Sequence, residues 1–279
     1  NIHRIDWMWA NKAVFDANGI SVPTTWDELN AAAEKLQAAG IIPFAHGGQA
    51  WQDATVFEAV AMGIGGNNYY KNCYVDLKES CLRSETTVKV FDQMRKLQGF
   101  TDEGSPGRDW NVATGMVIEG KAGFQIMGDW AKGEFTAAGK VPGVDYYCAA
   151  TPSNNGYLYN VDSFIFYKSS DPDKQAGQKL LAKLMMGKNF QKVFNLYKGS
   201  IPARLDVSMD EFDKCAKTSN ADIKTAGASG GLVPSFAHGM AQGNTMKAAL
   251  QDIITEHFNS DMSSVDAANA LADSVLANM

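Results

Sequence analysis

Apolar and polar residues alternate along the first quarter of the chain in a pattern that predicts a strand, two helices and a second strand. The mixed apolar run at residues 6–17 predicts a strand that leads into a short helix. A second helix is predicted to begin at Thr25, because Glu28 three residues later completes a capping box. Gly40 is expected to end this helix, and residues 41–45 predict the strand that follows.

The middle of the chain continues the alternation with two helices and a strand. Residues 55–62 are apolar on more than one face and predict a buried helix, whereas residues 86–97 predict an amphipathic one. Residues 120–127 predict a short apolar strand. A turn then leads into a helix beginning near Ala131, with Asp129 as its candidate cap.

Two more strands and a long helix follow. The strands are predicted at residues 146–150 and 164–167, separated by a polar loop at 153–156. The Asp-Pro-Asp sequence at 171–173 opens the helix. The apolar residues expected on its inner side are Leu180, Leu181, Leu184 and Met185. The remainder reads as helical, and strands that alternate with helices predict an α/β chain.

Composition and charge exclude several classes of protein. Apolar residues make up 45% of the 279 positions, and 14 Phe, 9 Tyr and 6 Trp require burial, which excludes a disordered chain. The formal net charge of −6 argues against general binding to nucleic acid or to an anionic membrane. No apolar run reaches the roughly 18 residues that a membrane-spanning helix needs.

The cysteines are Cys73, Cys81, Cys148 and Cys215, which allow three pairings. Cys73 and Cys81 bracket a short polar stretch that could return within disulfide reach, which would leave Cys148 and Cys215 for a long-range bond. Such bonds favour an exported protein. Four buried thiols of a cytosolic protein are the alternative.

Known catalytic and metal-binding motifs are missing from the sequence. It contains no phosphate-binding GxxxxGK[ST], no GxSxG and no HExxH. The histidines His3, His46, His238 and His257 do not pair at metal-ligand spacing, so no metal, cofactor or catalytic residue is predicted. We expect His46 to be structural, with a ligand contact from its loop as the alternative, and His257 to be solvated.

Three tryptophans stand in unusually polar surroundings. Trp51, Trp110 and Trp130 each lie beside amide or carboxylate residues at predicted loops or helix starts. Such indoles can stack on the C–H face of a pyranose while the polar neighbours bind its hydroxyls. The alternative is that they are ordinary half-buried surface residues.

The same residues carry a resemblance to a known family. The stretches concerned are 46–55, 107–111, 117–123, 127–135, 198–204 and 237–239. Together they resemble the glucose-binding, or glucose/mannose-binding, proteins of bacterial ABC importers, which are periplasmic family 1 solute-binding proteins. The likeness covers essentially the whole chain.

The resemblance implies a sugar receptor of the periplasm with the type II periplasmic-binding-protein architecture. Two α/β lobes would close on a hexose, most simply glucose, and deliver it to the membrane permease. The implied sugar contacts are Trp110, Trp130, Asp162, Lys198 and His238, with Trp51 and His3 as further candidates. Asp162 as a turn cap and Lys198 as a helix C-terminal cation are the structural alternatives.

The resemblance also implies how the chain divides into lobes. Residues 1–145 and 188–279 would form a nearly complete C-terminal lobe, and residues 146–187 would belong to the N-terminal lobe. The chain would lack about the first 110 residues of the family. We therefore expect residues 146–187 to expose strand edges and apolar surface, unless the missing part or another chain pairs with them.

Two other functions remain open from the sequence. A glycoside hydrolase would need two carboxylates beside the sugar, and the candidates are Asp109, Asp129 and Asp162. A sugar-sensing or adhesion module would reuse the same fold and dock onto a receptor.

Overall fold

The strands of the protein form two sheets in the computed structural model, which describes residues 1–153 and 156–279. The larger sheet has the order β3–β4–β2–β5. In that order its strands are Ile42–Phe44, Ala122–Ile126, Trp7–Asn11 and Tyr146–Ala150. β3 is parallel to β4, whereas β2 is antiparallel to both of its neighbours. The smaller sheet has the order β1–β6–β7, formed by Ile2–Arg4, Tyr157–Val161 and Leu232–Pro234.

A buried ion pair stabilises the connection between β1 and β2. The carboxylate of Asp6 is fully buried and accepts hydrogen bonds from the Arg4 guanidinium at 3.2 and 3.0 Å. It also accepts one from the backbone amide of Leu158 in β6, at 3.0 Å. The third guanidinium nitrogen of Arg4 donates to Asp222, 2.5 Å away. Since buried charges are costly unless they are paired, these bonds fix β1, β2 and β6 relative to one another.

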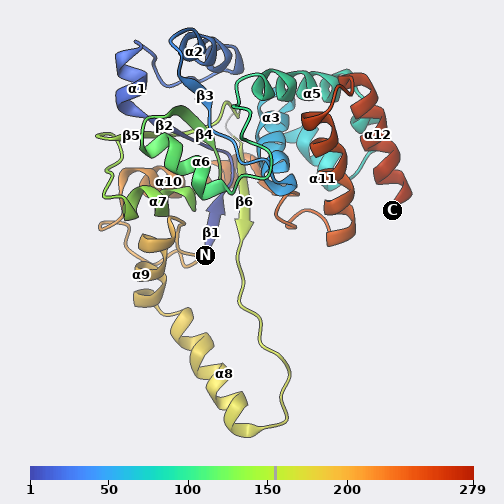
Figure 1. Cartoon of the computed structure of the whole chain (residues 1–279). Coiled ribbons are helices and arrows are strands. Elements are labelled where there is room, and N and C mark those ends of the chain that lie inside the picture. The colour runs from blue at the N-terminus through green and yellow to red at the C-terminus, as the bar shows by residue number, and fades with distance from the viewer. Residues whose placement is uncertain (154–155) are drawn as a thin grey trace.

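Helices surround both sheets (Figure 1). In chain order they are α1 Lys12–Ala17, α2 Trp26–Ala38, α3 Ala50–Tyr70, α4 Glu79–Leu82, α5 Glu85–Gln98, α6 Trp110–Ile118, α7 Ala131–Ala137, α8 Pro172–Met185, α9 Lys188–Lys198, α10 Lys214–Ser229, α11 Asn244–Asn259 and α12 Ser264–Ala277. A π-helical turn, η1 Lys71–Val75, extends α3. The alternation of strands and helices gives the α/β class that the sequence predicts.

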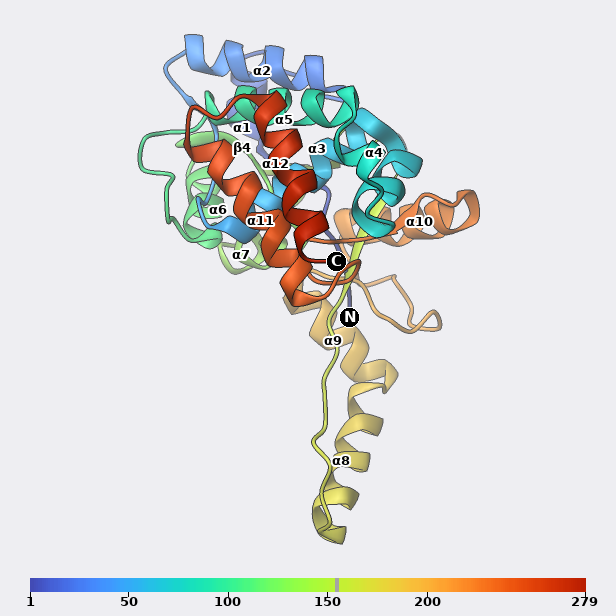
Figure 2. The same ribbon diagram turned by 90° about the vertical axis from the view of Figure 1, so that its right-hand side faces the viewer.

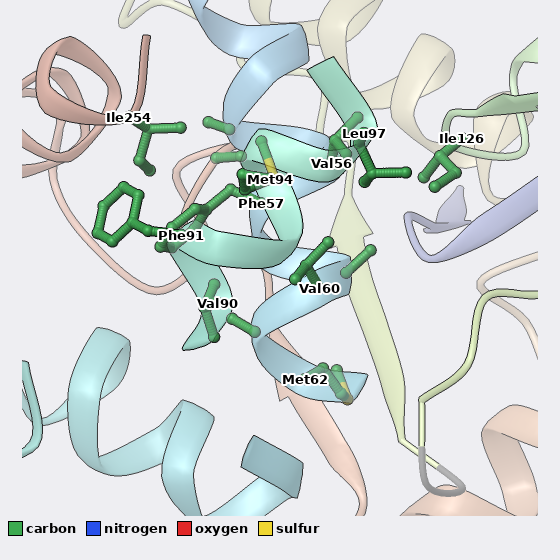
Figure 3. Close-up of a cluster of buried hydrophobic side chains, with 14 of the residues drawn as sticks. Val56, Phe57, Val60, Met62, Val90, Phe91, Met94, Leu97, Ile126 and Ile254 are labelled. Carbon is green, nitrogen blue, oxygen red and sulfur yellow. The ribbon is translucent and has the colours of Figure 1, made fainter. Parts of the chain in front are cut away.

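The main core lies where α3 packs between α5 and α11. Figure 3 shows the buried side chains at the contact of α3 and α5, among them Val56, Phe57, Val60, Val90, Phe91 and Met94. The rings of Phe57 and Phe91 lie 5.0 Å apart. This core therefore holds the start of α3, which carries Trp51, in a fixed place.

The cysteines form the two bonds considered from the sequence. Cys73 and Cys81 are joined, with their Cα atoms 5.2 Å apart. Cys148 of β5 is joined to Cys215 of α10, with Cα atoms 6.0 Å apart. The second bond ties the edge of the larger sheet to a helix that follows 67 residues later.

Residues 162–187 extend away from the rest of the molecule, as Figures 1 and 2 both show, and we call them the projecting arm. An irregular segment follows β6, and α8 runs back beside it toward α9. Most large apolar side chains on the arm are 41% to 80% exposed, whereas Met185 is buried, as the sequence predicts. The exposed ones are Phe164, Ile165, Phe166, Tyr167, Leu180, Leu181, Leu184 and Met186.

Several sequence predictions are confirmed. The strand and helix at residues 6–17 correspond to β2 and α1, and the strand at 146–150 is β5. The capping box of Thr25 and Glu28 is present at the start of α2. Of the polar loop predicted at 153–156, Asn154 and Asn155 lie outside the described residues.

Three predictions about the second half of the chain are wrong. Residues 164–167 form no strand, because the arm carries them away from both sheets, and the strand lies at Tyr157–Val161 instead. Leu180, Leu181 and Leu184 are exposed rather than inward, since no described residue covers that side of α8. His257 is fully buried, because it lies on the side of α11 that faces Phe91 of α5, at 4.8 Å between rings.

Within the ranges described above, no helix has both the length and the apolar character that crossing a bilayer requires. The strands β5 and β6 pair with β2 and β1, and the division of residues 146–187 into a separate lobe stays a prediction.

Candidate functional site

One pocket of about 540 Å³ brings together every residue that the resemblance assigns to the sugar. These are His3, Trp51, Trp110, Trp130, Asp162, Lys198 and His238. The pocket is also lined by Gly133, Glu134, Asn160 and Tyr197. Its walls are therefore indole, imidazole, carboxylate, amide, phenol and ammonium groups.

The lining residues come from the ends of elements that lie far apart in the sequence. His3 is in β1, and Asp162 directly follows β6, which pairs with β1. Trp51 and Trp110 lie in the first turns of α3 and α6, and Lys198 is the last residue of α9. The pocket consequently lies where the projecting arm leaves the body, and its shape depends on both sheets.

Trp130 is the centre of the aromatic wall. Its ring lies 5.4 Å from that of His3, 5.1 Å from that of His238 and 6.3 Å from that of Trp51. The side chain is half-buried, so part of the indole stays open to the pocket. A half-buried indole held on several sides is a rigid apolar surface on which a ring of C–H groups can stack.

His3 lies between two carboxylates and is itself buried. Its Nδ1 is 2.5 Å from Asp129 and its Nε2 is 3.0 Å from Asp162. Burial alone lowers the pKa of His3, but the two carboxylates outweigh this effect and raise the pKa to about 9. His3 is therefore an imidazolium near neutral pH, and both of its N–H groups donate to carboxylates.

Asp162 is the more exposed of these two carboxylates. The hydrogen bond from His3 lowers the pKa of Asp162 below its ordinary value, against the opposing effect of partial burial. The amide of Asn160 donates a further hydrogen bond to Asp162, at 2.9 Å. Asp162 is thus an ionised acceptor in a fixed orientation, which suits a hydroxyl donor in the pocket.

Asp129 has a different role from the helix cap predicted for it. Its carboxylate accepts a hydrogen bond from the backbone amide of Arg4, at 3.0 Å, in addition to its contact with His3. Helix α7 begins after Trp130 without a side-chain cap. Because β1 occupies both oxygens of Asp129, the side chain is not available to the first turn of α7.

Lys198 is exposed and makes no ion pair within the part of the chain that the structure describes. It ends α9, and the next residue, Gly199, has a φ of +92°, a left-handed conformation that glycine adopts readily. A Cβ at residue 199 would lie 2.4 Å from the carbonyl oxygen of Asp129. The glycine therefore allows the end of α9 to pack closely beside Trp130.

Sequence reasoning missed four lining residues, although two of them had a readable signal. Glu134 follows Trp130 by four positions, which is one turn of a helix, and Asn160 precedes Asp162 by two, which is the same face of a strand. Gly133 and Tyr197 had no such signal, because their place depends on the packing of α7 against α9.

The other candidates from the sequence lie outside the pocket. His46 is buried and pairs with Asp53 at 2.7 Å, which is the structural role expected for it. Asp109 accepts a hydrogen bond from the Gln49 amide. Over residues 1–153 and 156–279, no three His, Cys, Asp or Glu side chains gather closely enough to hold a metal ion.

Comparison with known proteins identifies the family. Residues 3–185 match the bacterial extracellular solute-binding protein family. The chain is 47% identical over 276 residues to a Brucella suis protein named "Probable sugar-binding periplasmic protein", covering 99% of the chain and 65% of the relative. It is 44% identical to a Rhizobium meliloti protein of the same name, with 99% and 66% covered. The chain thus spans slightly less than two thirds of the length of these relatives, which are solute-binding proteins and not enzymes.

The fold agrees with this result. A solved structure of the bacterial solute receptor AcbH, described as having an exclusive substrate preference for b-D-galactopyranose, superposes with a TM-score of 0.82 at 20% identity. The superposition covers 99% of this chain and 70% of that one. A chitin oligosaccharide binding protein gives a TM-score of 0.78 at 17% identity, with the same coverage of 99% and 70%. The chain belongs to the bacterial extracellular solute-binding protein family.

Proposed function

We propose that this chain is the greater part of a periplasmic receptor that binds a hexose and delivers it to an ABC permease. The observation that carries the proposal is the pocket itself, in which three indoles meet His3, Asp162, Lys198 and His238. The relatives named as sugar-binding periplasmic proteins support the same compartment and ligand class. The two disulfides suit an oxidising compartment.

In this proposal the aromatic and polar walls have separate roles. The indole of Trp130, with Trp51 and Trp110, stacks on the C–H face of the sugar. Asp162 accepts hydrogen bonds from hydroxyl groups, and Lys198 donates to hydroxyl oxygens. Hydrogen bonds to charged groups contribute about 1.5–3 kcal/mol each, so these two residues supply much of the selectivity.

We further propose that a second lobe covers the pocket. The projecting arm begins at Asp162, directly after β6, and leads back into α9, whose last residue is Lys198, and it exposes apolar side chains along its length. Apolar surface of this kind usually contacts another part of a protein. The third of the relatives' length that this chain does not span would form most of that lobe, with residues 146–187, and close on the sugar.

Glucose is the first candidate ligand, because the stretches that line the pocket resemble the glucose-binding and glucose/mannose-binding proteins. Calorimetric titration of the protein in its natural full length with glucose, mannose, galactose, xylose and maltose tests this. We expect one aldohexose to bind clearly more tightly than the others. If none of these sugars binds, the sugar-receptor proposal fails. Release of nitrophenol from a chromogenic glucoside would instead indicate an enzyme.

A further inference from the structure

A fully buried carboxylate, Glu58 of α3, lies behind the pocket at the loop that follows β7. Its Oε1 accepts a hydrogen bond from the Ser235 hydroxyl at 2.6 Å. Its Oε2 accepts from the Tyr70 hydroxyl at 2.9 Å and from the backbone amides of Phe236 and Ala237 at 3.1 and 3.3 Å. These four donors replace the water molecules that a carboxylate loses on burial. Glu58 therefore acts as an acceptor.

The Ser235 hydroxyl connects Glu58 to His238 by hydrogen bonds. Its single proton is committed to Glu58, so its oxygen can only accept further hydrogen bonds. The backbone amide of His238 donates to it at 3.1 Å, and Nδ1 of the His238 ring lies 2.9 Å away. For that second contact to be a hydrogen bond, Nδ1 must carry a proton.

The other ring nitrogen of His238 is then a bare acceptor. A neutral imidazole has one N–H group, and a proton on Nδ1 leaves a lone pair on Nε2. Within the described residues Nε2 has no hydrogen-bond partner, and less than 1 Å² of it is exposed. The residue lines the pocket, where its ring lies against Trp130 and Trp51.

We propose that Glu58, acting through Ser235, holds His238 in its Nδ1–H tautomer, so that Nε2 accepts a hydrogen bond from one ligand hydroxyl once the rings of Trp130 and Trp51, which pack against His238, move aside. Glu58 and Ser235 are positioning residues in this arrangement. The ligand class follows from the chemistry. An alcohol that donates a proton satisfies Nε2, whereas a deoxy, fluoro or methoxy group at the same position leaves it unpaired. This step rests on the proposed function, since it takes the ligand to be a sugar.

The tautomer can be measured without any sugar. The protein has four histidines, so ¹⁵N-histidine labelling and long-range ¹H–¹⁵N correlation resolve each ring, and His238→Gln assigns the signals of residue 238. We expect Nδ1 of His238 to be protonated and Nε2 to be unprotonated at pH 7.5. Ser235→Ala and Glu58→Gln should each shift the ring toward the Nε2–H form. A wild-type ring that is Nε2–H or doubly protonated overturns the proposal.

Sugar titration then tests the consequence for binding. We expect Ser235→Ala to weaken the affinity for the bound hexose about tenfold, which corresponds to about 1.4 kcal/mol. One monodeoxy analogue should lose affinity in the wild type but much less in Ser235→Ala. The matched control is Asp53→Asn, which alters a comparable buried carboxylate–histidine pair outside the pocket, at 2.7 Å from His46.

The tautomer measurement and the sugar titration together distinguish the possible reasons for a negative result. If Asp53→Asn weakens binding as much as Ser235→Ala, the effect comes from general destabilisation and the positioning role is wrong. If the tautomer is as expected but no sugar binds, the proposed function fails and the arrangement of His238 stands. Ser235→Ala keeps the test available if Glu58→Gln does not fold.

Discussion

Nε2 of His3 lies 3.0 Å from Oδ2 of Asp162, and this contact joins the start of the chain to the end of β6. The same ring contacts Asp129 through Nδ1, so one buried cation serves two carboxylates. Because its two ring nitrogens contact these carboxylates, His3 orients Asp162 and lowers the pKa of that carboxyl. A direct contact of His3 with the sugar stays a prediction.

The first prediction concerns the pH dependence of sugar binding. His3 has a pKa of about 9, so it is protonated at pH 7 and loses its proton as the pH rises through that value. Asp162 then loses the donor that orients it. We expect the affinity to be constant between about pH 6.5 and 8 and to fall as the pH rises through about 9. Calorimetric titration at several pH values measures this.

The control for this prediction is His3→Gln. The amide cannot titrate, so its affinity should be lower at pH 7 and should vary less between pH 8 and 10. The stability of the wild type should follow the same direction. A folded-state pKa above the ordinary 6.5 contributes stability that is complete below 6.5 and lost as the pH rises through about 9. If the sugar affinity of His3→Gln falls as steeply as that of the wild type between pH 8 and 10, the titration of His3 is not the cause.

The second prediction concerns Trp130, whose ring contacts those of His3, His238 and Trp51. We expect Trp130→Ala to weaken sugar binding about tenfold to a hundredfold, because the stacking surface is lost (about 1.4–2.8 kcal/mol). The change in tryptophan fluorescence on binding should also disappear. Trp26→Phe is the control, since Trp26 is buried outside the pocket and its loss should leave the sugar response in place.

The sequence predicts a structural feature well when the residues that form it lie close together in the chain. Helix starts with a cap, such as Thr25 and Glu28, were readable, because the residues that form the cap are near in sequence. The tryptophans of the pocket were found from their polar neighbours and a family resemblance. Glu58 and Ser235 could not be linked, because they are 177 positions apart and meet only through packing.

Burial was the least predictable property. His257 has polar and charged neighbours in sequence, yet it lies against Phe91 in the core. Leu180 and Leu184 have the helical spacing of a buried face, but the described chain places nothing over them. In both cases the pattern gives the side of the helix, and only the tertiary structure decides what covers that side.

The third prediction concerns His257, whose two ring nitrogens have no hydrogen-bond partner in the described part of the chain. Burial and, to a smaller extent, the nearby positive charge of Arg95 together lower the pKa of His257 to about 4. Between its ordinary value of 6.5 and about 4, the unfolded chain binds a proton that the folded chain does not. The free energy of unfolding should therefore fall as the pH falls through this range.

Replacing His257 by Leu isolates this contribution. We expect the variant to be more stable than the wild type at pH 5, by about 1–2 kcal/mol, and the difference to be smaller at pH 7. Urea unfolding at both pH values measures it. An equal difference at the two pH values would mean that packing, and not the proton, is responsible.

The fourth prediction compares the two disulfides. The bond between Cys148 and Cys215 closes a loop of 67 residues, and that between Cys73 and Cys81 closes one of 8. Loop-closure entropy assigns about 4 kcal/mol to the long loop and about 2.5 kcal/mol to the short one. Cys148→Ser with Cys215→Ala should therefore lower the free energy of unfolding more than Cys73→Ser with Cys81→Ala. The opposite order would show that the bonds act through native packing instead.

The fifth prediction tests what covers the projecting arm. Leu180 and Leu184 lie one helical turn apart on α8 and are 59% and 58% exposed. Changing both to Ser should leave the unfolding temperature of the 279-residue chain unchanged and reduce its self-association, measured by sedimentation velocity. If a second lobe covers these side chains in the natural full-length protein, the same change should destabilise that protein by about 2–5 kcal/mol. Leu205→Ser, at an 89% exposed position outside the arm, is the control and should affect neither. Equal stability of the full-length protein and its double variant would show that the second lobe does not pack on this face of α8.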